Sequence, residues 1–148
     1  DDADALAAIL REAIAVIGPR AYAPRQVDAW AARAPDPTRF VERAGMGDVL
    51  LVAADEADEA VAYAILERDG HLDHLYCHPE HTKRGLAEAL LAEADAHAGE
   101  FGAARLHAEA SELARPAFER AGYRVTHRRY FAIDGVAIHN FAMTKDLS

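Results

Sequence analysis

The chain has 148 residues, of which 51% are hydrophobic, and this suits one compact domain with a buried core. Its formal net charge of −9 argues against binding to nucleic acid, because phosphate-backbone binding requires a basic surface. No apolar run is long enough to span a bilayer, and the acidic first residues are unlike a signal peptide. Cys77 is the only cysteine, so we expect no internal disulfide, a cytoplasmic location and no membrane partner.

Helices are predicted at the start of the chain. Apolar residues at helical spacing indicate an amphipathic helix from Asp2 to Ile17, which Gly18-Pro19 ends. A second, short helix is expected from about Pro24 to Ala34 and carries Trp30. The pattern leaves residues 37–46 open, with a third short helix as one interpretation.

Three meandering strands follow, and they lead into the longest predicted helix. We expect these strands at Val49–Ala53, Ala60–Glu67 and His71–His78. Asp69-Gly70, between the second and third strands, is typical of a tight hairpin turn. After the third strand, a polar turn ends at Gly85, where a helix rich in alanine and leucine begins.

The rest of the chain predicts a strand, a helix and a long hairpin. The strand is expected at Ala103–Ala110, and Ser111 is placed to cap a helix from about Glu112 to Ala121. Two final strands, about Tyr123–Ile133 and Val136–Thr144, flank a second Asp-Gly turn. This order of elements predicts an α/β domain with a mixed sheet and about four helices.

The turn before the longest helix has the features of an anion site. The first N–H groups of a helix lack internal partners, and the helix dipole favours negative charge there. Lys83 and Arg84 add two cations, and Gly85 lets the backbone approach a phosphate without a Cβ in the way. The alternative is an ordinary turn with a solvated Lys83–Arg84 pair, because short motifs produce many false positives.

The motifs around this turn resemble those of the GNAT (GCN5-related N-acetyltransferase) family. In the family's central motif, an apolar strand and a proline precede Q/R-x-x-G-x-G/A, and here the segment reads YCHPEHTKRGLAEALL. Farther along, SELARPAFERAGY resembles the family's second motif. The resemblance runs from about Val49 to the end, and the chain looks like a small, stand-alone bacterial-type member.

The resemblance implies one domain over residues 1–148, with a mostly antiparallel sheet whose two middle strands splay apart. The family fold normally opens with a strand before the first helix; this sequence begins at that helix, so we expect that the strand is missing from it or was trimmed. Acetyl-CoA is the implied donor, with its pantetheine arm in the splay and its pyrophosphate at the helix start. The implied cofactor-binding residues are Leu75, Tyr76, Cys77, Thr82, Lys83, Arg84, Gly85, Leu86, Ala87, Ser111 and Phe118.

Two residues depart from the family pattern. Thr82 replaces the usual glutamine or arginine, so one side-chain contact to phosphate is expected to be weaker. Phe118 stands where many members have a tyrosine that protonates the leaving thiolate, and a phenyl ring has no proton to give. Because a thiol has a pKa of about 8.5, the thiolate can leave without an acid, and Tyr76 is the other candidate for that acid.

His74 and Tyr76 are the candidate catalytic residues. Acetyl transfer needs a neutral amine, a proton acceptor and stabilisation of the oxyanion. Strand alternation places His74 and Tyr76 on one face and Asp73 on the other, and histidine has an unperturbed pKa suited to a base. The alternative interpretation is a partly exposed strand histidine beside a core tyrosine.

Tyr22 and Trp30 are the candidate acceptor-binding residues. The family resemblance implies that the first helices build one wall of the acceptor pocket. The alternative is an aromatic pair that only packs these helices together.

Histidines and a cysteine cluster along the third strand and raise the question of a metal site. Strand alternation sends His74 and His78 to one side and His71 and Cys77 to the other, and His81 lies beyond the strand. These ligands do not converge on one ion, so we expect no metal.

We therefore expect an N-acetyltransferase that moves the acetyl group from acetyl-CoA to a small-molecule or peptide amine in a ternary complex, as a monomer or homodimer. The first alternative is a non-catalytic acyl-CoA-binding or sensing domain of the same fold, which Phe118 keeps open. The second is a structural interaction domain that binds no CoA.

Overall fold

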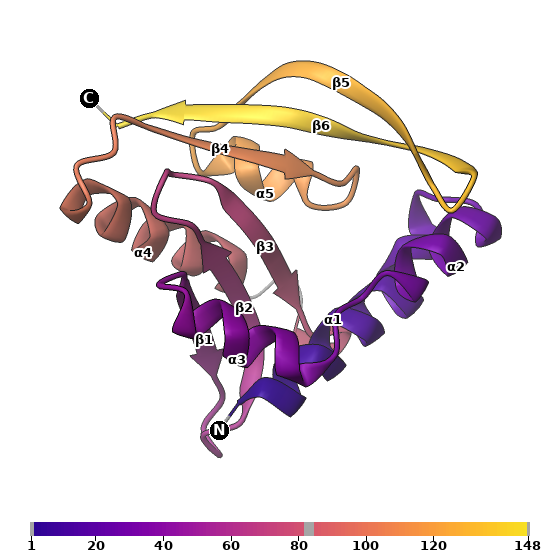
Figure 1. The fold of residues 1–148 in the computed structure, drawn as a ribbon, viewed down its shortest axis with the longest axis horizontal. Helices are drawn as coiled ribbons and strands as arrows, with labels where there is room; N and C mark the ends of the chain where they lie inside the picture. Colours follow the sequence, from indigo (N-terminus) through magenta and orange to yellow (C-terminus); the bar gives the residue numbers. More distant parts are fainter. Residues whose placement is uncertain (1, 82–84, 148) are drawn as a thin grey trace.

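Two three-stranded antiparallel sheets form the centre of the computed structural model, which describes residues 2–81 and 85–147 (Figure 1). The first sheet has the order β1-β2-β3, with β1 at Val49–Ala54, β2 at Ala60–Leu66 and β3 at Leu72–Cys77. The second has the order β4-β6-β5, with β4 at Arg105–Ala110, β5 at Arg124–Ile133 and β6 at Val136–Asp146. The predicted fold class, a mainly antiparallel sheet structure with several helices, is confirmed.

Helices precede the first sheet, at α1 Ala3–Ile17, α2 Pro24–Ala32 and α3 Pro37–Gly45, and a 3-10 turn, η1 Gly18–Arg20, follows α1. Helix α3 resolves the open interpretation of residues 37–46. The Asp36 side chain accepts a hydrogen bond from Arg39 N at 3.3 Å, and Pro37 occupies the first helical position. A capping aspartate followed by a proline suits the start of a helix, since neither position needs an intrahelical N–H bond.

A 3-10 turn, η2 Pro79–His81, follows β3, and the other helices are α4 Leu86–Glu100 and α5 Arg115–Arg120. Helix α5 begins three residues later than predicted. Ser111 Oγ does accept a hydrogen bond from Ala114 N at 3.1 Å, but it closes a turn before the helix. Pro116 has no N–H to donate, so it fits the first turn of a helix that begins at Arg115. No helix in the described ranges is both long and apolar enough to cross a membrane.

Strand β2 is buried on both faces and separates two hydrophobic cores. Ala62, Ala64 and Leu66 face the core under α4, whereas Tyr63 and Ile65 face the core under α1 and α3. Because both faces are apolar, β2 reads as a continuous apolar run rather than an alternating one.

The two sheets meet at one end only. An isolated parallel bridge joins His71 to His107, and His107 N donates to Gly70 O at 3.0 Å. Gly70 has φ +97°, and a Cβ there would lie 2.4 Å from Arg105 O, so this contact requires glycine. Beyond it, the described parts of β3 and β4 form no further ladder, and the strands diverge (Figure 1). The predicted splay is therefore the gap between β3 and β4.

Candidate active site

A cavity of about 550 Å³ opens where β3 and β4 have separated. Its lining comes from α1, β3, the start of α4 and the segment 111–117. This cavity, called here the larger cavity, brings together the predicted cofactor-binding residues Leu75, Tyr76, Cys77, Gly85, Leu86, Ala87 and Ser111. The predicted residues Thr82, Lys83 and Arg84 lie outside the described residues.

The start of α4 offers backbone donors to the larger cavity. Gly85 is the N-cap residue, with φ +77°, and it receives no side-chain capping bond. The first N–H that bonds back within the described helix is that of Ala89, to Gly85 O at 3.0 Å. The N–H groups of Leu86 and Ala87 lie in the first turn of the helix, where N–H groups lack partners within the helix, and their binding to an anion stays a prediction.

Two arginines that the sequence analysis missed also line this cavity. Arg20 comes from η1, and Arg120 comes from the last turn of α5, where it contacts Glu88 Oε1 at 2.9 Å. Both lie far in sequence from Gly85, so no local motif could have grouped them with it. They add positive charge to the walls that surround the helix start.

Strand β3 turns one edge toward the larger cavity. It is the outer strand of its sheet and pairs with β2 through Leu75↔Ala64, Tyr76↔Tyr63 and Cys77↔Ala62. Past the His71 bridge, its opposite edge faces the splay. Backbone groups on such an edge can pair with an extended, amide-containing ligand.

A second cavity of about 110 Å³, called here the smaller cavity, adjoins the first. The residues that line both cavities are Trp30, Leu75, Tyr76, Ser111 and Ala114. Tyr22, Asp73, Glu109, Phe118 and His139 line only the smaller one. The two cavities therefore share a wall, and Tyr76 is part of it.

Tyr22 and Trp30 pack together, as one interpretation of the sequence expects, and their role in binding the acceptor stays a prediction. Their rings pack edge to face with centroids 5.7 Å apart, and both residues line the smaller cavity. The Tyr22 hydroxyl donates to His139 O at 3.0 Å and accepts from Glu112 N at 2.9 Å. These bonds tie the loop after α1 to β6 and to the segment after β4.

Phe118 forms part of the wall of the smaller cavity. Its side chain is buried in the core under α4, and its ring packs edge to face on Tyr123 with centroids 4.9 Å apart. It provides an apolar surface there and no proton.

The two candidate catalytic residues lie in different surroundings. His74 lines neither cavity, and its Nδ1 is 2.9 Å from the Tyr63 hydroxyl. Burial lowers the pKa of His74 to about 4, so the ring is neutral and weakly basic near pH 7. Tyr76 lines both cavities, and burial raises its pKa to about 12, so its hydroxyl stays protonated.

The predicted alternation along β3 is wrong at Asp73. His74 pairs with Ile65 and Leu72 pairs with Leu66, which leaves Asp73 as the extra residue of a β-bulge. Asp73 Oδ2 consequently lies 3.7 Å from His74 Nε2, although simple alternation places the two side chains on opposite faces. Asp73 also lines the smaller cavity.

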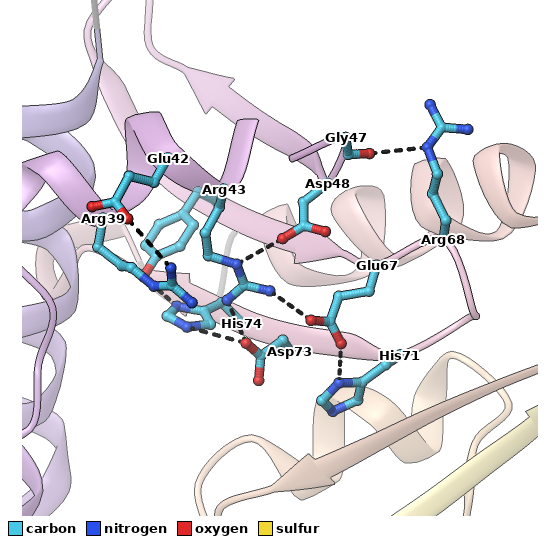
Figure 2. A network of polar contacts seen from close by, with 11 residues as sticks. Arg39, Glu42, Arg43, Gly47, Asp48, Glu67, Arg68, His71, Asp73 and His74 are labelled. Atoms are coloured by element: carbon cyan, nitrogen blue, oxygen red, sulfur yellow. Dashed lines mark hydrogen bonds and ion pairs between the residues drawn. The ribbon is translucent and has the colours of Figure 1, made fainter. Parts of the chain in front are cut away.

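Arg43 anchors Asp73 from α3 (Figure 2). Within the described ranges, Arg43 is the only buried charged side chain, at 6% exposed. Its guanidinium donates to Asp73, to Asp48 at 2.8 Å and to Glu67 at 3.1 Å. Although burial opposes it, the hydrogen bond from Arg43 holds the pKa of Asp73 below its usual value.

His71 continues this network to the second sheet. Its Nδ1 lies 2.5 Å from Glu67 Oε1 (Figure 2), and its Nε2 lies 2.8 Å from Glu109 Oε1 on β4. The hydrogen bond to Glu109, with that to Glu67, raises the pKa of His71 to about 9 against the cost of burial. The ring is therefore an imidazolium at neutral pH, and it lowers the pKa of Glu109.

The ligands considered for a metal site do not gather in the described structure. Of them, only His71 joins a compact group, in which ligand atoms of His71, Asp73 and Glu109 lie within 4.8 Å of one another. In this group both ring nitrogens of His71 contact carboxylates, Nδ1 that of Glu67 and Nε2 that of Glu109. Its charge instead balances the two carboxylates.

Comparison with known proteins agrees with this geometry. The family model described as "Acetyltransferase (GNAT) domain" matches residues 19–145. The uncharacterized N-acetyltransferase YafP of Escherichia coli is 30% identical over 143 residues, which cover 96% of this chain and 88% of YafP.

Two solved structures share the fold. A GCN5-related N-acetyltransferase from Rhodopseudomonas palustris has 32% sequence identity and a TM-score of 0.88, covering 98% of this chain and 89% of that one. The PaiA N-acetyltransferase from Thermoplasma acidophilum, in complex with coenzyme A, has 18% identity and a TM-score of 0.75, covering 98% and 92%. At that lower identity the likeness shows the fold alone.

Proposed function

Because the chain belongs to the GNAT acetyltransferase family and is an N-acetyltransferase that uses acetyl-CoA, we propose that it passes the acetyl group directly to an amine while both substrates are bound. The observation that carries this proposal is the wall shared by the two cavities, which includes Trp30, Leu75 and Tyr76. A donor in the larger cavity and an acceptor in the smaller one meet at this wall. No covalent carrier on the protein is then needed.

In this proposal the larger cavity holds the donor. The N–H groups of Leu86 and Ala87 bind the pyrophosphate, and the edge of β3 at Leu75 and Tyr76 pairs with the pantetheine arm. The glycine at position 85 supports this assignment, because a side chain there would enter the space in front of the helix start. In the sequence, Lys83 and Arg84 bring two further cations to the same loop.

The chemistry needs little from the protein beyond placement and hydrogen bonding. The neutral amine attacks the thioester carbonyl carbon, a C–N bond forms, and the C–S bond breaks with its electron pair on sulfur. Tyr76 can donate a hydrogen bond to the departing sulfur. With a pKa of about 12 against about 8.5 for a thiol, Tyr76 keeps its proton, and solvent carries the amine proton to the thiolate.

The position of His74 favours a different role from the one predicted for it. It lines neither cavity, and it is hydrogen-bonded to Tyr63. We therefore assign His74 to the support of β3 rather than to proton transfer.

Initial-rate kinetics of thiol release from acetyl-CoA test the proposal on a panel of primary amines. We expect one acetylated amine for each thiol released, and intersecting double-reciprocal plots, because both substrates must be bound before either product forms. Parallel plots with an acetylated protein intermediate would contradict direct transfer. Binding of acetyl-CoA without turnover of any amine would favour the sensing domain, the alternative that Phe118 keeps open.

A further inference from the structure

The smaller cavity presents two carboxylates to the proposed acceptor. Asp73 reaches it from the β-bulge of β3, and Glu109 reaches it from β4 on the other side of the splay. Each side chain is 33% exposed, so each carboxylate is accessible to a ligand without being free in solvent.

Each carboxylate has one oxygen held by the protein and one available. Asp73 Oδ2 accepts from Arg43, and Glu109 Oε1 lies 2.8 Å from His71 Nε2. In residues 2–81 and 85–147, no hydrogen-bond partner is found for Asp73 Oδ1 or Glu109 Oε2. An oxygen of Asp73 lies within 4.8 Å of one of Glu109. An ammonium group spans such a gap, because each N–H···O contact is about 2.8 Å long.

The charged groups around the smaller cavity include more carboxylates than cations. The described network contains two cations and four carboxylates: Arg43, His71, Asp48, Glu67, Asp73 and Glu109. Arg129 also lowers the pKa of Glu109, and the charges of Arg128 and Glu112 both act on Tyr22 in the wall of the same cavity. Counting these three groups as well gives five carboxylates against four cations. A cationic ligand would balance this charge.

The remaining walls suit the rest of such a ligand. The rings of Tyr22, Trp30 and Tyr76 line the cavity, with the Trp30 and Tyr76 centroids 6.4 Å apart. Aromatic rings pack against methylene groups and attract ammonium groups through their faces. These walls lie next to the anionic pair and lead to the wall shared with the larger cavity.

We propose that Asp73 and Glu109 form an anionic subsite that selects an acceptor carrying a second, non-reacting ammonium group, as in an aliphatic diamine. This inference rests on the proposed function, since it assigns the second substrate of the same site. The reacting amine must be neutral, whereas neighbouring carboxylates favour the protonated form of an amine. The pair therefore holds the non-reacting end, and the reacting nitrogen lies toward Tyr76.

Three amines of matched length test this subsite. They are 1,4-diaminobutane, n-pentylamine and 5-aminopentanoate, which end in an ammonium, a methyl and a carboxylate group. We expect kcat/KM to be about tenfold or more higher for the diamine than for n-pentylamine, and lowest for 5-aminopentanoate. Calorimetry on the CoA-bound protein should give the same order of affinities without any turnover.

Substitutions then show which residues cause the preference for the diamine. Glu109→Gln should raise KM for the diamine about tenfold and the KM for n-pentylamine much less, and a thermal melt shows whether loss of the ion pair with His71 also loosens the contact between β3 and β4. Asp73→Asn should act in the same way, and a thermal melt shows whether it also loosens the contact with Arg43. Glu93→Gln, on an exposed position of α4, is the matched control and should change neither constant.

The outcomes separate this inference from the proposed function. Turnover of the three amines with similar kcat/KM, or a Glu109→Gln variant that lowers kcat for every amine alike, would overturn the subsite and leave direct acetyl transfer standing. Tight, charge-selective binding of the diamine with no acetylation would support the subsite and contradict acetyl transfer.

Discussion

The two ends of the junction between β3 and β4 are built in opposite ways. At the closed end, the backbones of His71 and His107 form a bridge, and their rings stack with centroids 4.8 Å apart. At the open end, residues 75–77 face the segment 111–114 across the two cavities. β3 can therefore turn one edge toward the cavities at its open end because its other end is fixed to the second sheet.

The two ends also use different chemistry. Arg43 and His71 cross-link α3, β3 and β4 through carboxylates at the closed end. The open end combines aromatic and aliphatic side chains with two arginines, Arg20 and Arg120, and with the backbone at the start of α4. A buried ion network adds little net stability over an apolar one, but its geometry admits few alternatives. We infer that this network fixes how β3 sits against β4, and so fixes the width of the opening.

The largest expected effect is the loss of stability on replacing Arg43, the arginine whose ion pairs hold the closed end together. Arg43→Met keeps much of the side-chain volume but leaves Asp48, Glu67 and Asp73 without their shared cation. Removing one partner of a buried ion pair costs about 3–5 kcal/mol of the free energy of unfolding. Urea denaturation at pH 7 measures this loss.

The matched control for Arg43 is an arginine in an exposed ion pair. Arg33 contacts Asp134 at 3.0 Å, and the two side chains are 63% and 59% exposed. Arg33→Met should therefore cost at most about 1 kcal/mol. Equal losses for the two variants would show that the Arg43 network is no more than a set of surface pairs.

The next largest effect is the pH dependence of the free energy of unfolding that arises from the charge on His71. Its folded-state pKa of about 9 lies above the unfolded value of 6.5, so the folded state holds a proton that the unfolded state releases. This stabilisation is complete below pH 6.5 and is lost as the pH rises through 9. The difference between these two pKa values corresponds to a loss on the order of 3 kcal/mol in the free energy of unfolding between pH 6.5 and 9.

Replacing His71 isolates this contribution from other groups that titrate in the same range. His71→Gln has no titrating group at this position, so its free energy of unfolding should change less between pH 6.5 and 9 than that of the unmodified chain. Urea denaturation at several pH values measures both curves. Parallel curves would mean that His71 is not the cation joining Glu67 to Glu109.

Much of this arrangement could be read from the sequence, because local patterns encode it. Helical spacing gave α1 and α4, the Asp-Gly turns gave both hairpins, and Gly85 marked the start of α4. These features depend on residues close together in the chain. The splay between β3 and β4 followed from the family resemblance rather than from such patterns.

The features that the sequence did not reveal depend on distant pairings. The bulge at Asp73 arises from the register between β2 and β3, and strict alternation cannot anticipate an extra residue. Arg43 was not singled out, because its three carboxylate partners come from separate segments of the chain. His74 was assigned a catalytic role from its residue type, whereas the packing of α3 on β3 encloses it.

The smallest expected effect comes from replacing Gly85, at the open end, and is measured against the same replacement at Gly102. Gly85 has φ +77° and lines the larger cavity, whereas Gly102 has φ +80° and lines neither cavity. At both, a built Cβ comes no closer than 4.0 Å to any described atom outside the local chain. Alanine should therefore cost each position about 1–2 kcal/mol of stability through the same left-handed strain.

Only Gly85→Ala should also weaken the binding of CoA, because its Cβ would enter the space in front of the first N–H groups of α4. Loss of one such backbone contact is worth about 1.5 kcal/mol, or roughly a tenfold rise in Kd. Calorimetric titration with CoA measures this, and urea denaturation confirms that the two variants are matched in stability. If Gly102→Ala weakened CoA binding as much as Gly85→Ala, the loss would report general loosening, and Gly85 would be a structural turn rather than part of the binding site.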